Sequence, residues 1–203
     1  MHTSRILFFF IFLFSFASVR AQSNNPIGGH FGFKAGGSLT RLNVSGISSS
    51  IPKQMLQLHG GVMYRYRYQR FVAQPEVLLT VKGANLQQTQ IGTTQRINFP
   101  TKYYYVSVPL LLGYIPTEGL TLQAGPEFSY ALNAGKTGGP GSNSDVGIVV
   151  GAHYDFLDML DKFSLHVRYV YGLNNVSPEP LATYRNRNLQ VSMVYNLYKK
   201  KKK

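Results

Sequence analysis

The chain has 203 residues, contains no cysteine and carries a formal net charge of +13. Without cysteine it cannot be one of the small secreted scaffolds that depend on disulfides. After the first 21 residues, no segment approaches the run of roughly 18 apolar residues that a transmembrane helix needs. Much of the charge is terminal, because Arg5 and Arg20 contribute two charges and Lys199–Lys203 contribute five, which leaves +6 for the remainder.

The N-terminus has the three parts of a secretory signal peptide. Arg5 supplies the positive region, Ile6–Ala17 form a short apolar run, and Val19–Ala21 end in a small residue. We predict that residues 1–21 are removed and that the mature protein begins at Gln22. An uncleaved N-terminal membrane anchor is the alternative. Since an exported chain does not meet nucleic acid, we expect the basic charge to serve anionic lipid or polysaccharide instead.

Eight segments of the mature chain alternate between apolar and polar residues with a period of two, which is typical of β-strands. In the fourth segment, Val106, Val108, Leu110 and Leu112 share one face. Tyrosines stand at the ends of several apolar faces, and small or polar residues fill the opposite faces. In chain order the segments are Phe31–Leu39, Leu56–Arg67, Phe71–Gly83, Tyr104–Tyr114, Leu120–Tyr130, Asp145–Asp155, Phe163–Asn174 and Asn188–Tyr198.

The connectors between these segments alternate between long ones, such as Ala84–Pro100, and short ones, such as the "IPTEG" turn. A closed barrel with an even number of strands places all the long loops at one end. We therefore predict an all-β fold, an eight-stranded antiparallel up-and-down transmembrane β-barrel, over residues 22–198. It would cross the cell outer membrane many times, with apolar faces toward lipid and both termini in the periplasm. The alternative is a soluble lipocalin-like barrel, whose apolar faces turn inward.

Three prolines, Pro75, Pro109 and Pro126, lie inside predicted strands. Proline cannot donate a ladder hydrogen bond, and a closed barrel has no free edge to hold it. We expect bulges or positions at the barrel rim to accommodate them.

The sequence resembles the PorT-like outer-membrane β-barrel family that is common in Bacteroidetes. The resemblance implies an integral outer-membrane barrel, and most members of that family have no assigned biochemical activity. The family's namesake is similar to a component of the type IX secretion and gliding machinery, which implies an accessory role in type IX secretion as an alternative function. The resemblance covers nearly the whole mature chain and rests on "GFKAGGSL", "QPEVLLTVKG", "YVSVPLLLGY", "LQAGPEFSY", "DVGIVVGAHY", "RYVYGLNNV" and "RNLQVSMVYNL".

Several charged residues on the polar faces are expected to meet inside the barrel. Glu76 and Glu127 are the inward carboxylates near the middle of strands, and inward bases outnumber them. Because buried charges must be paired, we predict a salt-bridge network that plugs the lumen, rather than a path for a substrate. The predicted members are Lys34, Arg65, Glu76, Lys82, Glu127 and Arg168.

A second polar group lies on the sixth and seventh segments. If the turn between them pairs residues symmetrically, His153 opposes His166 and Asp155 opposes Ser164 near the periplasmic mouth. Two imidazoles, a carboxylate and a hydroxyl are the ingredients of a hydrolase triad or a metal site. Small barrels also fill their interiors with such polar groups, and we favour that interpretation. We therefore expect no catalytic residue, no bound metal and no cofactor.

The loop sequence "AGKTGG" (Ala134–Gly139) has part of a phosphate-binding pattern. The full pattern needs a glycine five positions before Gly135, and Tyr130 stands there. We predict a surface loop at this position and no nucleotide site.

These patterns predict a non-enzymatic outer-membrane barrel that presents its extracellular loops and has a structural or accessory role. A barrel that hydrolyses lipid or peptide with the histidine cluster is a further alternative. The expected partners are outer-membrane lipid and other envelope or secretion proteins, and the sequence predicts no particular oligomeric state. The basic tail 199–203 is expected either at the periplasmic membrane interface or free in solvent.

Overall fold

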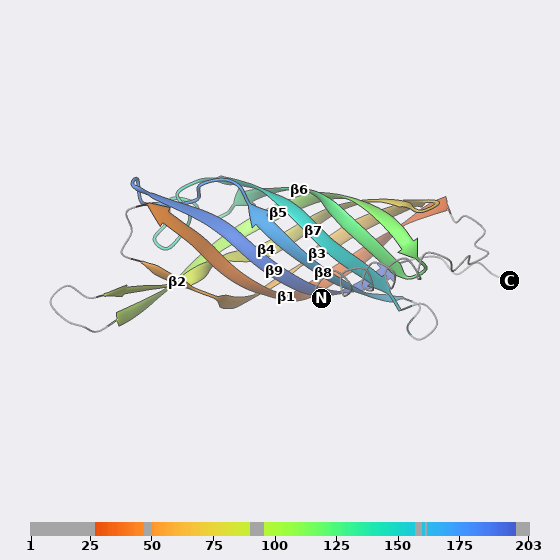
Figure 1. The fold of residues 1–203 in the computed structure, drawn as a ribbon, viewed down its shortest axis with the longest axis horizontal. Helices are drawn as coiled ribbons and strands as arrows, with labels where there is room; N and C mark the ends of the chain where they lie inside the picture. The colour runs from red at the N-terminus through yellow and green to blue at the C-terminus, as the bar shows by residue number, and fades with distance from the viewer. Residues whose placement is uncertain (1–26, 47–49, 90–95, 157–159, 161, 198–203) are drawn as a thin grey trace, which may run out of the picture.

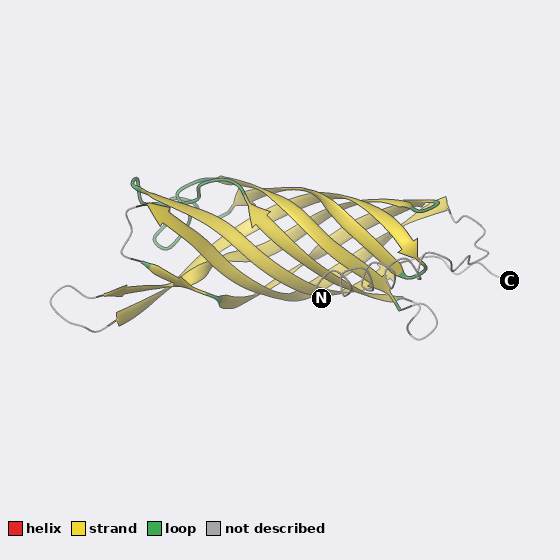
Figure 2. Ribbon diagram, viewed as in Figure 1, coloured by secondary structure: helices red, strands yellow, loops and turns green. Residues whose placement is uncertain are grey.

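The computed structural model describes residues 27–46, 50–89, 96–156, 160 and 162–197. The predicted signal peptide and the lysine tail lie outside these residues. Within them, no helix is long and apolar enough to cross a membrane. Figure 2 shows that strands make up nearly all of the described chain. The strands are β1 (Ile27–Gly46), β2 (Ile51–Lys53), β3 (Met55–Tyr68), β4 (Phe71–Thr89), β5 (Arg96–Thr117), β6 (Leu120–Ala131), β7 (Ser144–Asp155), β8 (Phe163–Gly172) and β9 (Ala182–Leu197).

Eight of these strands close into an antiparallel barrel (Figure 1). Each barrel strand pairs with its neighbours in the sequence, and the circle closes where β1 pairs with β9 from Phe31↔Leu197 to Gly46↔Ala182. The predicted eight-stranded barrel is therefore confirmed. The short strand β2 was not predicted, and it pairs with β4 at Ile51↔Gln87, beyond the end of the β3–β4 ladder.

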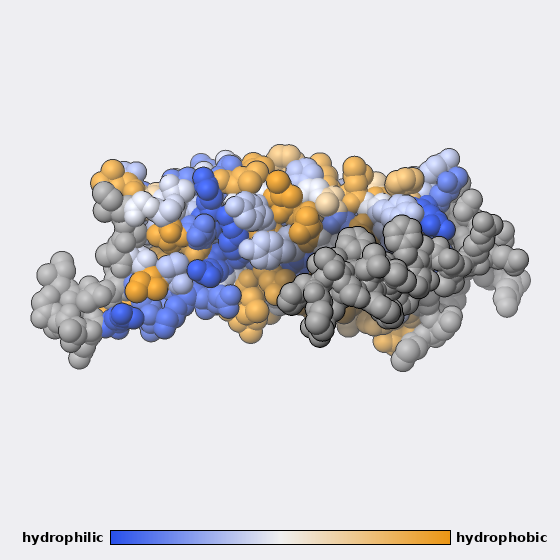
Figure 3. Space-filling model, in the orientation of Figure 1, coloured by the Kyte–Doolittle hydropathy of each residue, from blue (hydrophilic) through white to orange (hydrophobic). Residues whose placement is uncertain are grey.

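The apolar faces of the strands point outward. In β5, Leu110 is 44% exposed and Leu112 is 71% exposed, whereas Leu111 between them is buried. Exposed apolar side chains cover the wall in every barrel strand, and Figure 3 shows hydrophilic residues (blue) gathering on the end where the β4–β5 hairpin projects. Monomeric soluble proteins rarely expose contiguous apolar patches larger than about a few hundred Å². A wall with exposed apolar side chains on every strand therefore argues against the soluble barrel and fits a surface that faces lipid.

The chain from Ala84 to Pro100 is not the long loop that we predict from the sequence. β4 and β5 stay paired past the barrel rim, from Asn85↔Pro100 to Thr89↔Arg96, and so form a hairpin that extends away from the wall. Beyond the rim Leu86 of β4 stays buried, whereas Arg96–Pro100 of β5 are all exposed, so this part of β5 lacks the alternating burial of the wall strands. The alternation pattern therefore cannot reveal it.

The three strand prolines lie neither at bulges nor at the rim, so that prediction is wrong. At each proline two successive residue pairs are missing from one ladder, and the ladder resumes beyond them in the same register. In the β3–β4 ladder, for example, Met63↔Glu76 and Tyr66↔Ala73 lie on either side of the interruption. Each proline keeps a partner in the ladder on its other side: Pro75↔Leu110, Pro109↔Glu127 and Pro126↔Ile148.

Candidate functional site

A continuous chain of alternating charges crosses the middle of the lumen. Lys34 Nζ lies 3.0 Å from Glu76 Oε2, and Arg168 Nη1 lies 2.9 Å from the same oxygen. Arg168 Nη2 is 3.8 Å from Glu127 Oε2, and Lys82 Nζ is 3.0 Å from Glu127 Oε1. Lys82 also pairs with Asp145 at 3.2 Å. All six side chains are almost completely buried. We call these residues the lumen chain.

The lumen chain draws on strands from all around the barrel. Lys34 comes from β1, Glu76 and Lys82 from β4, Glu127 from β6, Asp145 from β7 and Arg168 from β8. The inward faces also supply small residues that leave space for these long side chains. Gly151 faces Arg168 across the β7–β8 ladder, and a Cβ at Gly151 would lie 2.7 Å from the Arg168 Cβ. Glycine is therefore needed where the largest buried side chain enters the lumen.

The charges of the lumen chain balance, with three cations and three anions. Our expectation that bases outnumber acids is wrong for two reasons. Asp145 belongs to the chain, although the sequence places it at the end of its strand. Arg65, which we predict in the network, instead lies 3.4 Å from Asp155 in a separate group. A balanced chain satisfies the requirement that buried ions be paired.

Amide and imidazole groups complete the surroundings of Glu76 and its two cations. Gln74 donates to Glu76 Oε1 at 2.7 Å, and Arg168 Nε donates to Gln190 at 2.6 Å. His166 Nδ1 lies 2.7 Å from Lys34 Nζ. The carboxylate of Glu76 therefore contacts two cations and one amide donor. Removal of its charge would leave both cations without their main partner.

The second predicted group has the register that we expect from the sequence. His153 faces His166, and Asp155 faces Ser164, across the β7–β8 ladder. The two imidazole centroids are 5.2 Å apart. His153 Nε2 lies 3.2 Å from Asp155 Oδ1, and Arg65 joins the same carboxylate. This group lies closer to the short turns than the lumen chain does, beside the turn that joins β7 and β8.

The hydroxyl of Ser164 is not placed for nucleophilic attack. It donates to Asp155 Oδ1 at 2.6 Å and accepts from Asn196 at 2.6 Å, and no hydrogen bond joins it to either histidine in the described chain. A catalytic triad needs the hydroxyl beside the imidazole. Within the described residues, no three His, Cys, Asp or Glu side chains lie in a group that would hold a metal ion.

The end of the lumen that lies toward the long loops is filled by a cluster of apolar and aromatic residues, which is not among the features predicted from the sequence. Tyr103 and Tyr105 of β5 pack inside the barrel with Leu42 of β1 and Tyr184 of β9. The β8–β9 loop folds over them, because Val176 is fully buried in the same cluster and its N–H donates to Tyr184 O at 2.9 Å. The inward position of Tyr105 in the alternating pattern was the available signal.

His59 is a further buried residue of the lumen, outside both groups predicted from the sequence. Its two ring nitrogens each lie 2.7 Å from a serine hydroxyl, Ser38 on one side and Ser192 on the other. Its two hydrogen bonds therefore connect β3 with β1 and with β9. His59 lies between the lumen chain and the apolar cluster. Neither serine contacts a carboxylate among the described hydrogen bonds, so this group also lacks the arrangement of a triad.

Solved structures share the fold of this chain. It is 13% identical to the outer membrane protein OprG from Pseudomonas aeruginosa, with a TM-score of 0.53, and the match covers 85% of this chain and 98% of that one. It is 12% identical to neisserial surface protein A, with a TM-score of 0.51, over 84% of this chain and 99% of that one. No curated protein sequence matches the chain.

The family to which the chain belongs follows from its sequence as well as its fold. A family model described as an outer membrane protein beta-barrel domain matches residues 20–177, which is most of the chain. The outward apolar wall and the filled polar lumen are the features that such a domain needs in a bilayer. The chain is therefore a member of the outer membrane protein beta-barrel domain family.

Proposed function

We propose that this protein is a non-conducting, non-enzymatic barrel of the outer membrane, with a structural or accessory role exercised through its loops. The observation that carries this proposal is the filling of the lumen at three levels. The apolar cluster lies toward the long loops, the lumen chain in the middle, and the Arg65, His153 and Asp155 group toward the short turns. An eight-stranded barrel is only wide enough for side chains to fill it.

Purified protein in a planar bilayer is expected to show no steady conductance, because ions would have to displace buried, paired charges to pass. Recording should be made beside a porin as the positive control and empty detergent as the baseline. Steady channels of uniform size would contradict the proposal. Rare, irregular current steps that also occur in the baseline would leave it standing.

The orientation that we propose places the long loops outside the cell and both termini in the periplasm. Because the native chain has no cysteine, single cysteines give clean labels. Lys136→Cys in the β6–β7 loop is expected to react with a membrane-impermeant maleimide on whole cells. Glu118→Cys in the β5–β6 turn is expected to react only after the outer membrane is opened. The opposite labelling pattern would mean that the barrel is inverted.

A second candidate is an accessory role in type IX secretion, which rests on the resemblance to the PorT-like family. That role predicts that deletion of the protein blocks export of type IX cargo, and that the wild-type chain restores it. Normal export by the deletion strain would leave the structural role alone. Both candidates use the same barrel, so the conductance and labelling results apply to each.

A further inference from the structure

The outer wall changes from apolar to positively charged between two successive outward residue pairs of the β1–β9 ladder. Leu39 lies opposite Leu189, and both face outward with 45% and 40% of their surface exposed. The next outward pair along the same ladder, toward the long-loop end, is Arg41 opposite Arg187. Two residues advance a strand by about 7 Å. An apolar pair is thus followed directly by two positive charges on the same face.

Two arginines directly opposite each other on one face of an antiparallel pair repel. Arg187 is held in place: its Nη1 donates to Gly172 O at 2.6 Å and to Asn186 O at 2.8 Å, and its guanidinium lies 3.4 Å from the centroid of the Tyr171 ring. Arg41 is exposed, and no carboxylate of the described chain pairs with either arginine. The fold therefore keeps a like-charge pair that it does not neutralise.

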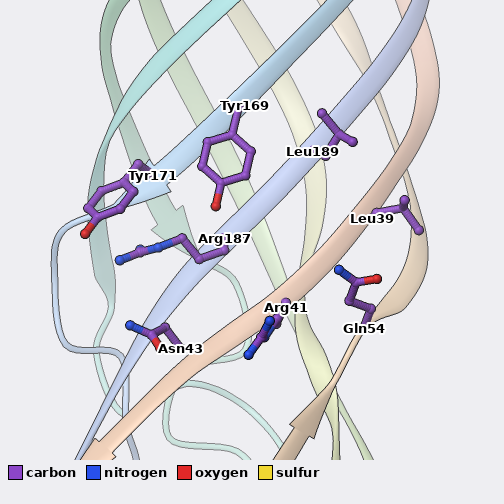
Figure 4. A pocket seen from close by; sticks show the side chains of 8 residues that line it. All are labelled: Leu39, Arg41, Asn43, Gln54, Tyr169, Tyr171, Arg187 and Leu189. Atoms are coloured by element: carbon purple, nitrogen blue, oxygen red, sulfur yellow. The ribbon is translucent and has the colours of Figure 1, made fainter. Parts of the chain in front are cut away.

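A groove of about 410 Å³ runs over this pair on the outside of the barrel (Figure 4). The side chains of Arg41, Arg187, Asn43 and Gln54 supply hydrogen-bond donors at one end, and Leu39 and Leu189 lie at the other. Tyr169 and Tyr171 form its side on β8. Tyrosines are typical of the level where lipid headgroups meet the hydrocarbon. The groove is thus amphipathic along the direction of the barrel axis.

We propose that this groove binds the phosphate of a membrane lipid, with the two arginines on the phosphate and the acyl chains along the leucines. Guanidinium groups bind phosphate oxygens in a forked geometry, and a phosphate between Arg41 and Arg187 turns their repulsion into attraction. A free anion would use the arginines and leave the leucine end unused. The assignment of this lipid to the outer leaflet rests on the orientation proposed above.

The test uses the full-length protein in non-ionic detergent and native mass spectrometry. Diphosphorylated lipid A is the probe, and the same lipid with its phosphates removed is the comparison. The wild type is expected to bind the phosphorylated lipid at least about tenfold more tightly. Equal binding of the two lipids would overturn the proposal. Displacement of the lipid by an equal concentration of inorganic phosphate would also overturn it, because the site would then be one for a free anion.

Arg41→Gln separates binding from folding. Because Arg41 has no described partner to lose, the variant is expected to unfold at the same temperature as the wild type, or slightly higher, since repulsion from Arg187 is removed. Its affinity for phosphorylated lipid A is expected to fall about tenfold. Arg70→Gln removes an exposed arginine from the opposite end of the barrel and is expected to leave the affinity unchanged.

Unchanged affinity in Arg41→Gln would contradict the proposal, as would an equal loss in Arg70→Gln, which would indicate attraction by overall charge alone. Micelles have no leaflets, so the binding result does not depend on orientation. The maleimide labelling pattern does not depend on Arg41. Failure of the lipid site and failure of the proposed orientation are therefore distinguishable.

Discussion

Glu76→Gln is expected to lower the free energy of unfolding by about 3–5 kcal/mol, because it leaves two buried cations without their shared anion. Lys34 and Arg168 both lie within 3.0 Å of Glu76 Oε2, and neither side chain is exposed to solvent. The glutamine amide fits the same space but carries no charge. The loss should appear in urea unfolding in detergent, followed by circular dichroism because the chain has no tryptophan.

Glu118→Gln is the matched control for this experiment. Glu118 forms a 3.2 Å ion pair with Arg67, but its side chain is 40% exposed, so solvent screens the pair. Its loss should cost less than about 1 kcal/mol. Adding Lys34→Met to Glu76→Gln should recover part of the stability, because it removes one of the stranded cations. An unchanged unfolding curve in Glu76→Gln would show that water reaches the lumen chain.

Leu110→Arg is expected to destabilise the barrel in a bilayer by about 2–4 kcal/mol, since it places a charge near the middle of the lipid-facing wall. Leu110 is 44% exposed on the outward face of β5. The protein is folded into lipid vesicles, and unboiled and boiled samples are compared on a gel. The fraction of folded protein is the fraction of the unboiled sample that migrates differently from the boiled one. Leu181→Arg in the β8–β9 loop is the control. Leu181 is even more exposed, at 71%, but it lies outside the wall, so the change should stay within about 0.5 kcal/mol.

An equal effect of both arginine substitutions would contradict the lipid-facing assignment of β5. A large effect of Leu110→Arg in detergent and none in vesicles would do so too. The control matters because arginine also changes the net charge, and both variants change it by the same amount.

The wall of the barrel could be predicted from the sequence because each wall residue faces one of two environments. Lipid lies outside and packed polar groups lie inside, so alternation is imposed on every wall strand. The β7–β8 register, with His153 opposite His166, followed from a short turn between two alternating strands. The ends of the strands could not be predicted in this way. Past the rim Arg96–Pro100 of β5 are exposed on both faces, and the alternating burial that marks a wall strand is lost.

The partners inside the lumen could be predicted only as a set. Alternation places Arg65 and Asp145 on inward faces, but their height along the axis depends on the stagger between strands that are distant in the sequence. Asp145 meets Lys82 of β4, and Arg65 of β3 meets Asp155 of β7. Neither pair joins sequence-adjacent strands, so turn geometry gives no information about them. The groove at Arg41 and Arg187 was missed for the same reason, because it lies across the β1–β9 closure.

The β1–β9 ladder also governs when the protein can become stable. It joins Phe31 to Leu197, whereas the other ladders of the barrel join strands that are close in the sequence. A contact between distant segments must overcome the entropy of closing a long loop, and it forms slowly. Arg168 on β8 reaches Glu76 on β4 across the lumen, so this ion pair needs the closed barrel. Assembly therefore has to wait for the last strand to be delivered. Until then the nascent chain has two open edges and unpaired ions, and it needs protection during its transit to the membrane.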